Sequence, residues 1–381
     1  MLKSNRRYLQ GTHFFLSYSL FHTMFRRLLI CWIIGVLFLS DTLAQSWNSD
    51  SLARSIPAGV IGSPEDFARY LKERFPKKTD RVKALFSWLG HHIIYDFSQV
   101  ESINRFESID DFVLYTLKNE KAVCQGYAEV FTAVCNSMGV PAITVHGYNR
   151  IDGRLKSDIG HAWNVARIDD KWYLFDPTWG SGYVDNGRYR KSFDALYFMT
   201  PPDSLLESHM PFDPIWQLRE YPISHDQFIN GGNHGSIYYN FSDSLALYYS
   251  QDEKERAEGT LRRAEAIHAN RKEIYKMYKK YYDYVVNIRC NIEITRYNES
   301  STSLRDAIDR FNEFQEIRNR KNPNRAQQKA LLEVAGSLVQ QSFTIARGIN
   351  SCPSLSRQEI QRLIRQISEV DNAVLSSLRS L

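Results

Sequence analysis

Cysteine is scarce in this chain, and the motifs that mark common cofactors are missing. Only five of the 381 residues are cysteine. No CxxC or HExxH spacing occurs, so a metal site has little support, and we expect no metal and no cofactor. A glycine-rich phosphate-binding loop is also absent, which argues against the nucleotide-binding classes built on one. Low-complexity tracts are missing too, so the composition is that of a folded protein.

The charge of the chain gives no sign of a nucleic-acid partner. The formal net charge is +5, but residues 1–44 contain five basic residues and one acidic residue. Most of the positive charge therefore belongs to this segment, and the rest of the chain is close to neutral. Binding to nucleic acid depends on an extended positive surface, so we expect no nucleic-acid partner.

The N-terminal segment has the pattern of an export signal. Two arginines precede the apolar run 28–40, and Thr42 and Ala44 place small residues at the −3 and −1 positions of a cleavage site. The run is too short for a comfortable membrane span. We therefore expect residues 1–44 to be a signal peptide that is cleaved near Ala44. The protein would then be exported, periplasmic or extracellular, with no integral membrane span after cleavage.

Two alternatives stay open at this end of the chain. The apolar run can also serve as an uncleaved anchor. Translation can begin at Met24 rather than Met1, because that start gives the signal a conventional basic beginning, "MFRRLL". No cysteine lies at the cleavage site, so we expect no lipid attachment there.

Removal of Cys31 with the signal leaves four cysteines: Cys124, Cys135, Cys290 and Cys352. Four cysteines in an exported chain of this length do not make a disulfide framework. Cys124 and Cys135 lie eleven residues apart on one predicted helix, a separation of roughly 16 Å, so they cannot pair. A bridge between the other two stays open.

Residues 45–235 are predicted to form one domain in which helices come before strands. Apolar periodicity predicts helices at 64–75, 80–92, 109–117 and 123–138. Segments rich in β-branched and aromatic residues predict strands at 142–148, 161–168 and 171–176. The first two strands are joined by a polar loop, and Asp169 and Asp170 form a tight turn between the last two. Residues 177–235 are expected to pack on this core as an ordered excursion.

From residue 242 onward nearly everything has the periodicity of helices. Polar breaks at "ESSTS", "KNPN" and "INSCPSLS" divide this part of the chain. Helices are predicted at 242–250, 253–269, 272–296, 302–319, 324–348 and 355–379. We therefore expect an all-α C-terminal domain over 242–381, built as a bundle or as stacked hairpins.

Cys124 stands at the start of the predicted helix 123–138. The unpaired backbone N–H groups and the positive dipole end at a helix start favour a thiolate, and they can also hold an oxyanion. Gly126 lies in the same turn, although glycine costs a helix roughly 1 kcal/mol relative to alanine. Its missing side chain would allow close approach of a substrate or of a facing element. On its own, Cys124 can equally be a buried structural cysteine.

His161 and Asp176 are brought together by the expected register of the last two strands. If Asp169 and Asp170 form a two-residue turn, residues 161, 163, 176 and 178 share one face of the sheet. The two residues are then diagonal neighbours across the strands, within reach of a side-chain contact. An unrelated surface histidine near a turn aspartate is the alternative. The order Cys, His, Asp supplies a nucleophile, a proton acceptor and a group that orients the acceptor.

Three stretches together resemble the transglutaminase-like superfamily: "DRVKALFSWLGHHIIYD", "AVCQGYAEVF" and "GHAWNVARIDDKWYLFDPTWG". The resemblance covers roughly 65–220 and points to the branch that contains the kyphoscoliosis peptidase and fungal cytokinesis proteins. It implies that the nucleophile falls on Cys124, the histidine on His161 and the aspartate on Asp176. It also implies an α+β fold with a papain-like core, in which helices pack on an antiparallel sheet. Nothing resembles the calcium sites of animal transglutaminases.

Three further residues are weaker candidates for contact with the substrate. Trp163 and Trp179 flank the histidine and the aspartate, so they can wall the site or pack in the core. Gln125 can donate to the oxyanion or face outward from the helix, and the N–H of Cys124 is the safer donor.

The resemblance implies an exported thiol enzyme that acts on peptide or protein amides through a thioester. We expect hydrolysis rather than cross-linking, and a protein partner for the C-terminal helices. The alternative is a catalytically silent binding or scaffold protein of the cell envelope, because some members of this branch have lost their catalytic residues. Rapid labelling of an activated Cys124 would favour the enzyme over the scaffold.

Overall fold

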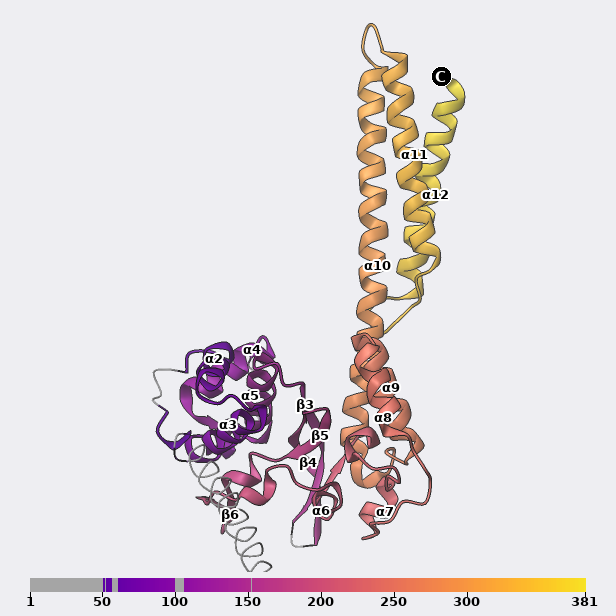
Figure 1. Cartoon of the computed structure of the whole chain (residues 1–381). Helices are drawn as coiled ribbons and strands as arrows, with labels where there is room; N and C mark the ends of the chain where they lie inside the picture. Colours follow the sequence, from indigo (N-terminus) through magenta and orange to yellow (C-terminus); the bar gives the residue numbers. More distant parts are fainter. Residues whose placement is uncertain (1–50, 52, 57–60, 100–105, 152) are drawn as a thin grey trace, which may run out of the picture. The chain divides into compact units, whose positions relative to one another are not determined.

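The computed structural model describes residues 51, 53–56, 61–99, 106–151 and 153–381 (Figure 1). The expected signal peptide, 1–44, and the alternative start at Met24 lie outside these residues. Within the described ranges, no helix has both the length and the apolar character needed to cross a membrane.

The chain divides into two compact units. The first unit ends at Pro211 and also includes Trp216–Leu218, whereas the second comprises Phe212–Ile215 and Arg219–Leu381. The second unit thus begins well before the boundary expected at 235. Helix α7 (His225–Ile229) belongs to it because the backbone N–H of His225 donates to the carbonyl of Ile267 at 3.0 Å.

The first unit begins with helices whose ends follow local sequence signals. They are α2 (Pro64–Arg74), α3 (Lys78–His92), α4 (Ile109–Asn119) and α5 (Cys124–Ser137). The side chain of Ser63 accepts from the backbone N–H of Asp66 at the start of α2, and Ser108 caps α4 in the same way. Gly139, with a φ of +74°, follows the end of α5. All four helices lie close to the predicted positions.

Helix α5 is the centre of the first unit and packs on strands β3 and β4. Its buried face carries Tyr127, Val130, Phe131 and Val134, which join one hydrophobic core with α2, α3 and the sheet. The hydroxyl of Tyr127 also donates to the carbonyl of Ile93 at 2.7 Å. Burial of this apolar stripe fixes the start of α5 relative to the sheet.

The sheet of the first unit has four strands in the order β5-β4-β3-β8, and each neighbouring pair is antiparallel. The strands are β3 (Ala142–Ile151), β4 (Arg154–Ile168), β5 (Lys171–Phe175) and β8 (His209–Pro211). The polar loop expected between the first two strands is instead part of a long hairpin, because Asn149 pairs with Lys156 beyond a bulge. The polar composition of this segment therefore led to the prediction of a loop where the two strands in fact continue to pair.

Short elements complete the first unit. Strands β1 (Ile94–Tyr95) and β2 (Lys121–Ala122) form a parallel pair, and β6 (Gly182–Asp185) and β7 (Arg188–Lys191) form a hairpin. The remaining turns of helix are η2 (Phe97–Gln99), η4 (Trp179–Ser181), η5 (Ala195–Tyr197) and α6 (Pro202–Leu206), whereas η6 (Pro214–Gln217) is divided between the two units. Residues after β5 are therefore ordered, as the sequence predicts.

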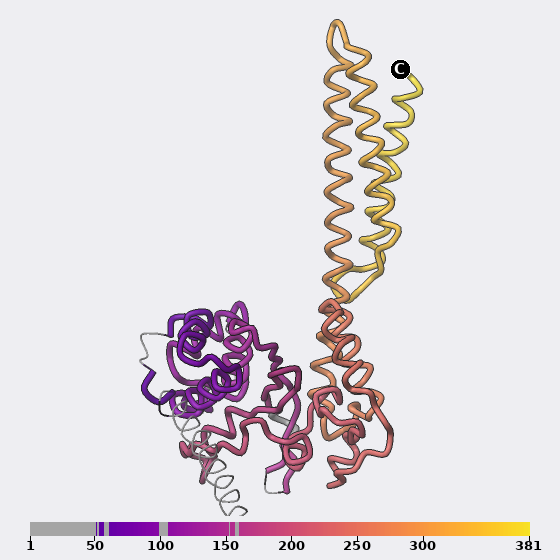
Figure 2. The backbone as a smooth tube through the Cα atoms, viewed as in Figure 1, coloured from indigo at the N-terminus to yellow at the C-terminus, as the bar shows by residue number. Residues whose placement is uncertain are grey.

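The second unit is helical, and its last three helices lie side by side in Figures 1 and 2. Its elements from 241 onward are α8 (Phe241–Ser250), α9 (Glu253–Ala266), η7 (Lys272–Ile274), α10 (Tyr275–Arg318), α11 (Arg325–Arg347) and α12 (Arg357–Ser380). A disulfide joins Cys290 of α10 to Cys352, which precedes α12. The bridge that the sequence left open is thus formed.

The break predicted at "ESSTS" is wrong, because α10 runs through it without interruption. Ser300 and Ser342 are fully buried, and their hydroxyls lie 3.0 Å apart where α10 packs on α11. The hydroxyl of Ser342 also donates to the carbonyl of Ser300 at 2.8 Å. Small residues allow close approach of two helices, so these serines mark an interface rather than a loop.

Candidate active site

Cys124 is the first residue of α5 and is half-buried. The preceding residue, Val123, supplies no side-chain cap, and no acidic residue lies in the first turn. No acidic residue of this first turn therefore neutralises the positive end of the helix dipole. This environment favours a thiolate and leaves backbone N–H groups that can bind developing negative charge.

Gly126 provides close approach for a facing element rather than for a substrate. A Cβ atom built at this position would lie 2.5 Å from the Cβ of Ala122 and 3.0 Å from the hydroxyl of Thr116. Strand β2 and helix α4 therefore need a glycine here to reach the first turn of α5.

His161 and Asp176 meet as the register of the hairpin requires. Ile168 pairs with Lys171 and Asn164 with Phe175, which places Trp163 opposite Asp176 just beyond the last paired residues. The Nε2 atom of His161 lies 2.7 Å from Oδ2 of Asp176. Both side chains are almost completely buried. The carboxylate thus orients the imidazole. A thiol enzyme needs such an oriented imidazole as its proton acceptor.

The carboxylate of Asp176 is held rigidly by its own loop. Its Oδ1 atom accepts from the backbone N–H groups of Thr178 at 2.8 Å and Trp179 at 3.0 Å. Burial alone would raise the pKa of Asp176, but the charge and the hydrogen bond of His161, together with His209, hold it well below its usual range. Asp176 is therefore a carboxylate at all ordinary pH values.

The electrostatics of His161 favour its protonated form. Burial acts to lower its pKa, whereas the charge and the hydrogen bond of Asp176 and the contact with Cys124 act to raise it. The second group of effects wins and raises the pKa of His161 to about 10. Because Nε2 is engaged by Asp176, the Nδ1 atom is left for the hydrogen bond with the Cys124 side chain. These effects stabilise the protonated imidazole of His161 beside the Cys124 side chain.

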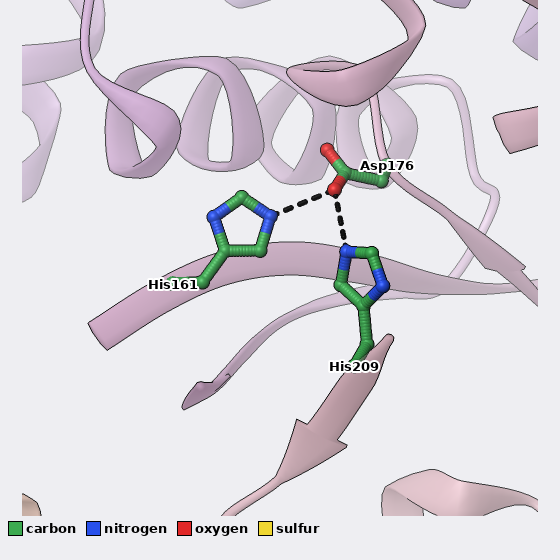
Figure 3. A group of neighbouring side chains, drawn as sticks. All are labelled: His161, Asp176 and His209. Carbon is green, nitrogen blue, oxygen red and sulfur yellow. Dashed lines mark hydrogen bonds and ion pairs between the residues drawn. The ribbon is translucent and has the colours of Figure 1, made fainter. Parts of the chain in front are cut away.

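A second histidine binds the same carboxylate oxygen. The Nε2 atom of His209 lies 2.9 Å from Oδ2 of Asp176, and Figure 3 shows the two imidazoles converging on it. His209 was not predicted from the sequence. No local pattern marks it, because β8 lies 33 residues beyond the aspartate and reaches it only by pairing with β3.

Tyr95 is a further residue of the site that was not predicted from the sequence. Strand β1 pairs with β2 so that Tyr95 lies opposite Ala122, two residues before Cys124. The hydroxyl of Tyr95 hydrogen-bonds to the backbone of Cys124. Burial, followed by the negative charges of Cys124 and Asp176, raises the pKa of Tyr95, so this hydroxyl keeps its proton. A neutral O–H therefore stands beside the amide of the candidate nucleophile.

The structure places the three weaker candidates differently. Trp163 is buried and its ring lies 5.8 Å from that of His161, so it packs beneath the site. Trp179 is half-buried and its ring lies 6.0 Å from His161, on the edge of the site. The side chain of Gln125 hydrogen-bonds to Glu129, one turn further along the same helix. Gln125 is thus engaged along α5.

Among the described residues, one group of side chains has the types and spacing that could bind a metal ion: His161, Asp176 and His209. Their ligand atoms lie within 4.8 Å of one another. The hydrogen bonds from the two imidazoles to Oδ2 satisfy these atoms without an ion. The arrangement is therefore complete as a hydrogen-bonded cluster.

Comparison with known proteins finds similar sequences for this region. Residues 65–177 match the model of the transglutaminase-like superfamily. The kyphoscoliosis peptidases of Mus musculus and Homo sapiens are each 35% identical over 170 residues, which is 42% of this chain and 25% of theirs. The Lim and transglutaminase domain protein ltd-1 of Caenorhabditis elegans is 22% identical over 196 residues, 47% of this chain and 26% of that protein.

The chain therefore spans about a quarter of the length of these curated relatives. Among solved structures, a TGase is 18% identical, with a TM-score of 0.28 over 54% of this chain and 50% of that one.

Proposed function

We infer that residues 65–177, which match the transglutaminase-like superfamily, form a domain of the branch that includes the kyphoscoliosis peptidases, with a cysteine-enzyme-like fold. From this premise, we propose that the protein is a thiol enzyme that acts on peptide or protein amides. One observation carries the proposal. The buried His161–Asp176 pair is oriented toward a half-exposed cysteine at the start of a helix.

The first half of the reaction forms a thioester. The thiolate of Cys124 attacks the carbonyl carbon of the amide, which makes a C–S bond and a tetrahedral oxyanion. The backbone N–H of Cys124, which is hydrogen-bonded to the hydroxyl of Tyr95 in the resting site, and that hydroxyl are the donors we propose for this oxyanion. His161, protonated in the resting pair, gives its proton to the leaving nitrogen as the C–N bond breaks. An amine or ammonia departs.

The second half releases the acyl group. Water attacks the thioester, and His161 takes its proton while the C–S bond breaks. A carboxylic acid leaves, and the thiolate–imidazolium pair is restored. Asp176 keeps Nδ1 of His161 directed at the sulfur throughout. We propose water rather than an amine as the ordinary acceptor, so that the net reaction is hydrolysis.

We also propose that the protein acts outside the cytoplasm. The basic and apolar pattern of residues 1–44 is that of an export signal, with a periplasmic or extracellular destination. The disulfide between Cys290 and Cys352 fits an oxidising compartment. The helical second unit is proposed to bind a protein partner. No nucleic acid, metal or other cofactor is part of this proposal.

A peptide library examined by mass spectrometry, with and without added primary amine, tests the activity. Hydrolysis adds water at a peptide bond, whereas deamidation of a side-chain amide adds about one mass unit and cross-linking adds the amine. We expect products from the intact protein and none from Cys124→Ala or His161→Ala variants that keep their fold. Unchanged products from Cys124→Ala would refute the assignment. No products from any form would favour the scaffold alternative.

A further inference from the structure

We propose that His209 is a positioning residue. Its Nε2–H donates to Oδ2 of Asp176, the same oxygen that binds His161, and so sets both the orientation of the carboxylate and the strength of its hydrogen bond with His161. The proposal rests on the thiol mechanism above. It adds a fourth side chain to the nucleophile, the histidine and the aspartate. His209 touches neither the sulfur nor the substrate, and it acts through Asp176 alone.

The geometry requires His209 to be a donor. Oδ2 of Asp176 lies 2.7 Å from Nε2 of His161 and 2.9 Å from Nε2 of His209 (Figure 3). A carboxylate can only accept hydrogen bonds, so both Nε2 atoms must carry protons. Oδ1 accepts two backbone N–H groups. Asp176 therefore receives four hydrogen bonds, two from its own loop and two from imidazoles.

The bond to Asp176 sets the tautomer of His209, and a neighbouring hydroxyl can accommodate it. The hydroxyl of Ser208 lies 2.8 Å from Nδ1 of His209. Burial lowers the pKa of His209 despite the hydrogen bond with Asp176, so the ring is neutral and has one N–H. With that N–H on Nε2, Nδ1 is the acceptor for Ser208. The result is a chain of hydrogen bonds from Ser208 through His209 and Asp176 to His161.

The fold builds a place for this second imidazole. Strand β8 pairs with β3 so that His209 lies opposite Asn149. This approach depends on Gly147, where an added Cβ would lie 2.1 Å from the carbonyl oxygen of Met210. The ring of Trp179 meets that of His209 edge-on at 4.4 Å, and the ring of Trp163 does so at 5.2 Å. His209 is fully buried, so water cannot easily replace it as the donor to Asp176.

The shared oxygen has a consequence for His161. Each donor to Oδ2 withdraws some of its negative charge, so the hydrogen bond of His209 weakens the pull of Asp176 on the proton of His161. The other titratable groups around the pair are Cys124 and Tyr95 on the helix side and Tyr197 on η5. None of these donates a hydrogen bond to Oδ2 in place of His209. Loss of His209 should therefore raise the pKa of His161 and free the carboxylate to turn.

Two substitutions separate positioning from packing. His209→Leu fills a similar volume without a donor, and His209→Gln keeps an N–H near the position of Nε2. For the leucine variant we expect kcat to fall about tenfold to a hundredfold at nearly constant KM, as for the loss of one hydrogen bond to a charged group. The pH titration of His161, followed by nitrogen-15 NMR without substrate, should move upward by about one unit. The glutamine variant should restore most of both properties.

Three outcomes decide the matter. Equal loss in the leucine and glutamine variants, with an unchanged titration of His161, would show that His209 only fills space. If the variants do not fold, nitrogen-15 spectra of the intact protein must show His209 as the neutral Nε2–H tautomer near pH 7, and an Nδ1–H tautomer would overturn the proposal. If the intact protein has no turnover but the titration still shifts, the proposed function fails while the role of His209 stands.

Discussion

Nε2 of His161 lies 2.7 Å from Oδ2 of Asp176, and this single contact determines which ring nitrogen of the imidazole is directed at the nucleophile. The Nδ1 atom is the one that remains for Cys124. Because both partners are almost completely buried, little water competes for the contact. A neutral residue of the same shape in place of Asp176 would lose both the charge and the preference for one tautomer.

The variant Asp176→Asn should therefore retain its fold but lose most of its activity. We expect kcat to fall roughly 10⁴-fold, the loss seen when a triad aspartate is replaced in this way. The charge and the hydrogen bond of Asp176 raise the pKa of His161 against the effect of burial. Without them, His161 loses its proton at lower pH, so the alkaline limb of the kcat/KM profile should move down from near 10.

A matched control for this variant is Asp170→Asn. Asp170 lies in the turn between β4 and β5, and its side chain is 90% exposed. Its loss should leave both the activity and the pH profile unchanged. A normal pH profile in Asp176→Asn would contradict the assigned role of the pair.

Thiol labelling should distinguish the two free cysteines without any substrate. Cys124 is half-buried at the start of α5, whereas Cys135 is completely buried in the same helix. Burial raises the pKa of the Cys135 thiol far above its ordinary value. We expect iodoacetamide near neutral pH to modify Cys124 at least a hundredfold faster, as peptide mapping would show.

His161→Ala provides the control for labelling. It removes the partner of the thiolate without exposing Cys135, so the rate at Cys124 should fall. Slow and equal modification of both cysteines in the intact protein would remove the support for an activated nucleophile.

Tyr95→Phe should lower the rate of the chemical step. The hydroxyl of Tyr95 hydrogen-bonds to the backbone of Cys124, where the oxyanion would form. Loss of one oxyanion donor costs roughly 10²- to 10³-fold in kcat in enzymes of known mechanism. Single-turnover measurement of thioester formation should show this loss at nearly constant substrate affinity. Tyr70→Phe on α2 is the matched control, because the ring of Tyr70 faces Arg74 rather than the site.

An unchanged rate in Tyr95→Phe would leave the backbone N–H of Cys124 as the donor that matters. A higher rate would mean instead that the hydroxyl occupies the place of the oxyanion and that substrates must displace it.

The sequence was sufficient for the parts of the site that depend on local periodicity. A two-residue turn and the alternation of side chains along strands bring His161 and Asp176 to one face, and a helix start places Cys124 at the beginning of α5, because these rules act over a few residues. That Cys124 belongs with this pair was implied only by the family resemblance. His209 and Tyr95 depend instead on which strands pair. The contacts of β8 with β3 and of β1 with β2 join segments far apart in the chain. No local pattern records such pairings.

Helix α10 shows the same limit in the second unit. Its stretch of serines has the composition of a loop, and only the neighbouring helix explains it. Ser300 is buried against Ser342, 42 residues away, so tertiary packing overrides the local preference. Serine at a helix interface and serine in a turn are identical in sequence.

The disulfide in the second unit should contribute measurably to its stability. Cys290 and Cys352 are separated by 62 residues, so the bridge closes a long loop in the unfolded chain. Replacing both by serine should lower the free energy of unfolding of this unit by about 2–4 kcal/mol. Far-UV circular dichroism during chemical denaturation would follow the change, because the unit is helical. Treatment of the intact protein with a reductant should reproduce it, whereas the reduced double variant should show no further loss. Identical midpoints for the intact and double-serine proteins under oxidising conditions would mean that packing of α10 against α11 and α12 holds the bundle without the bridge.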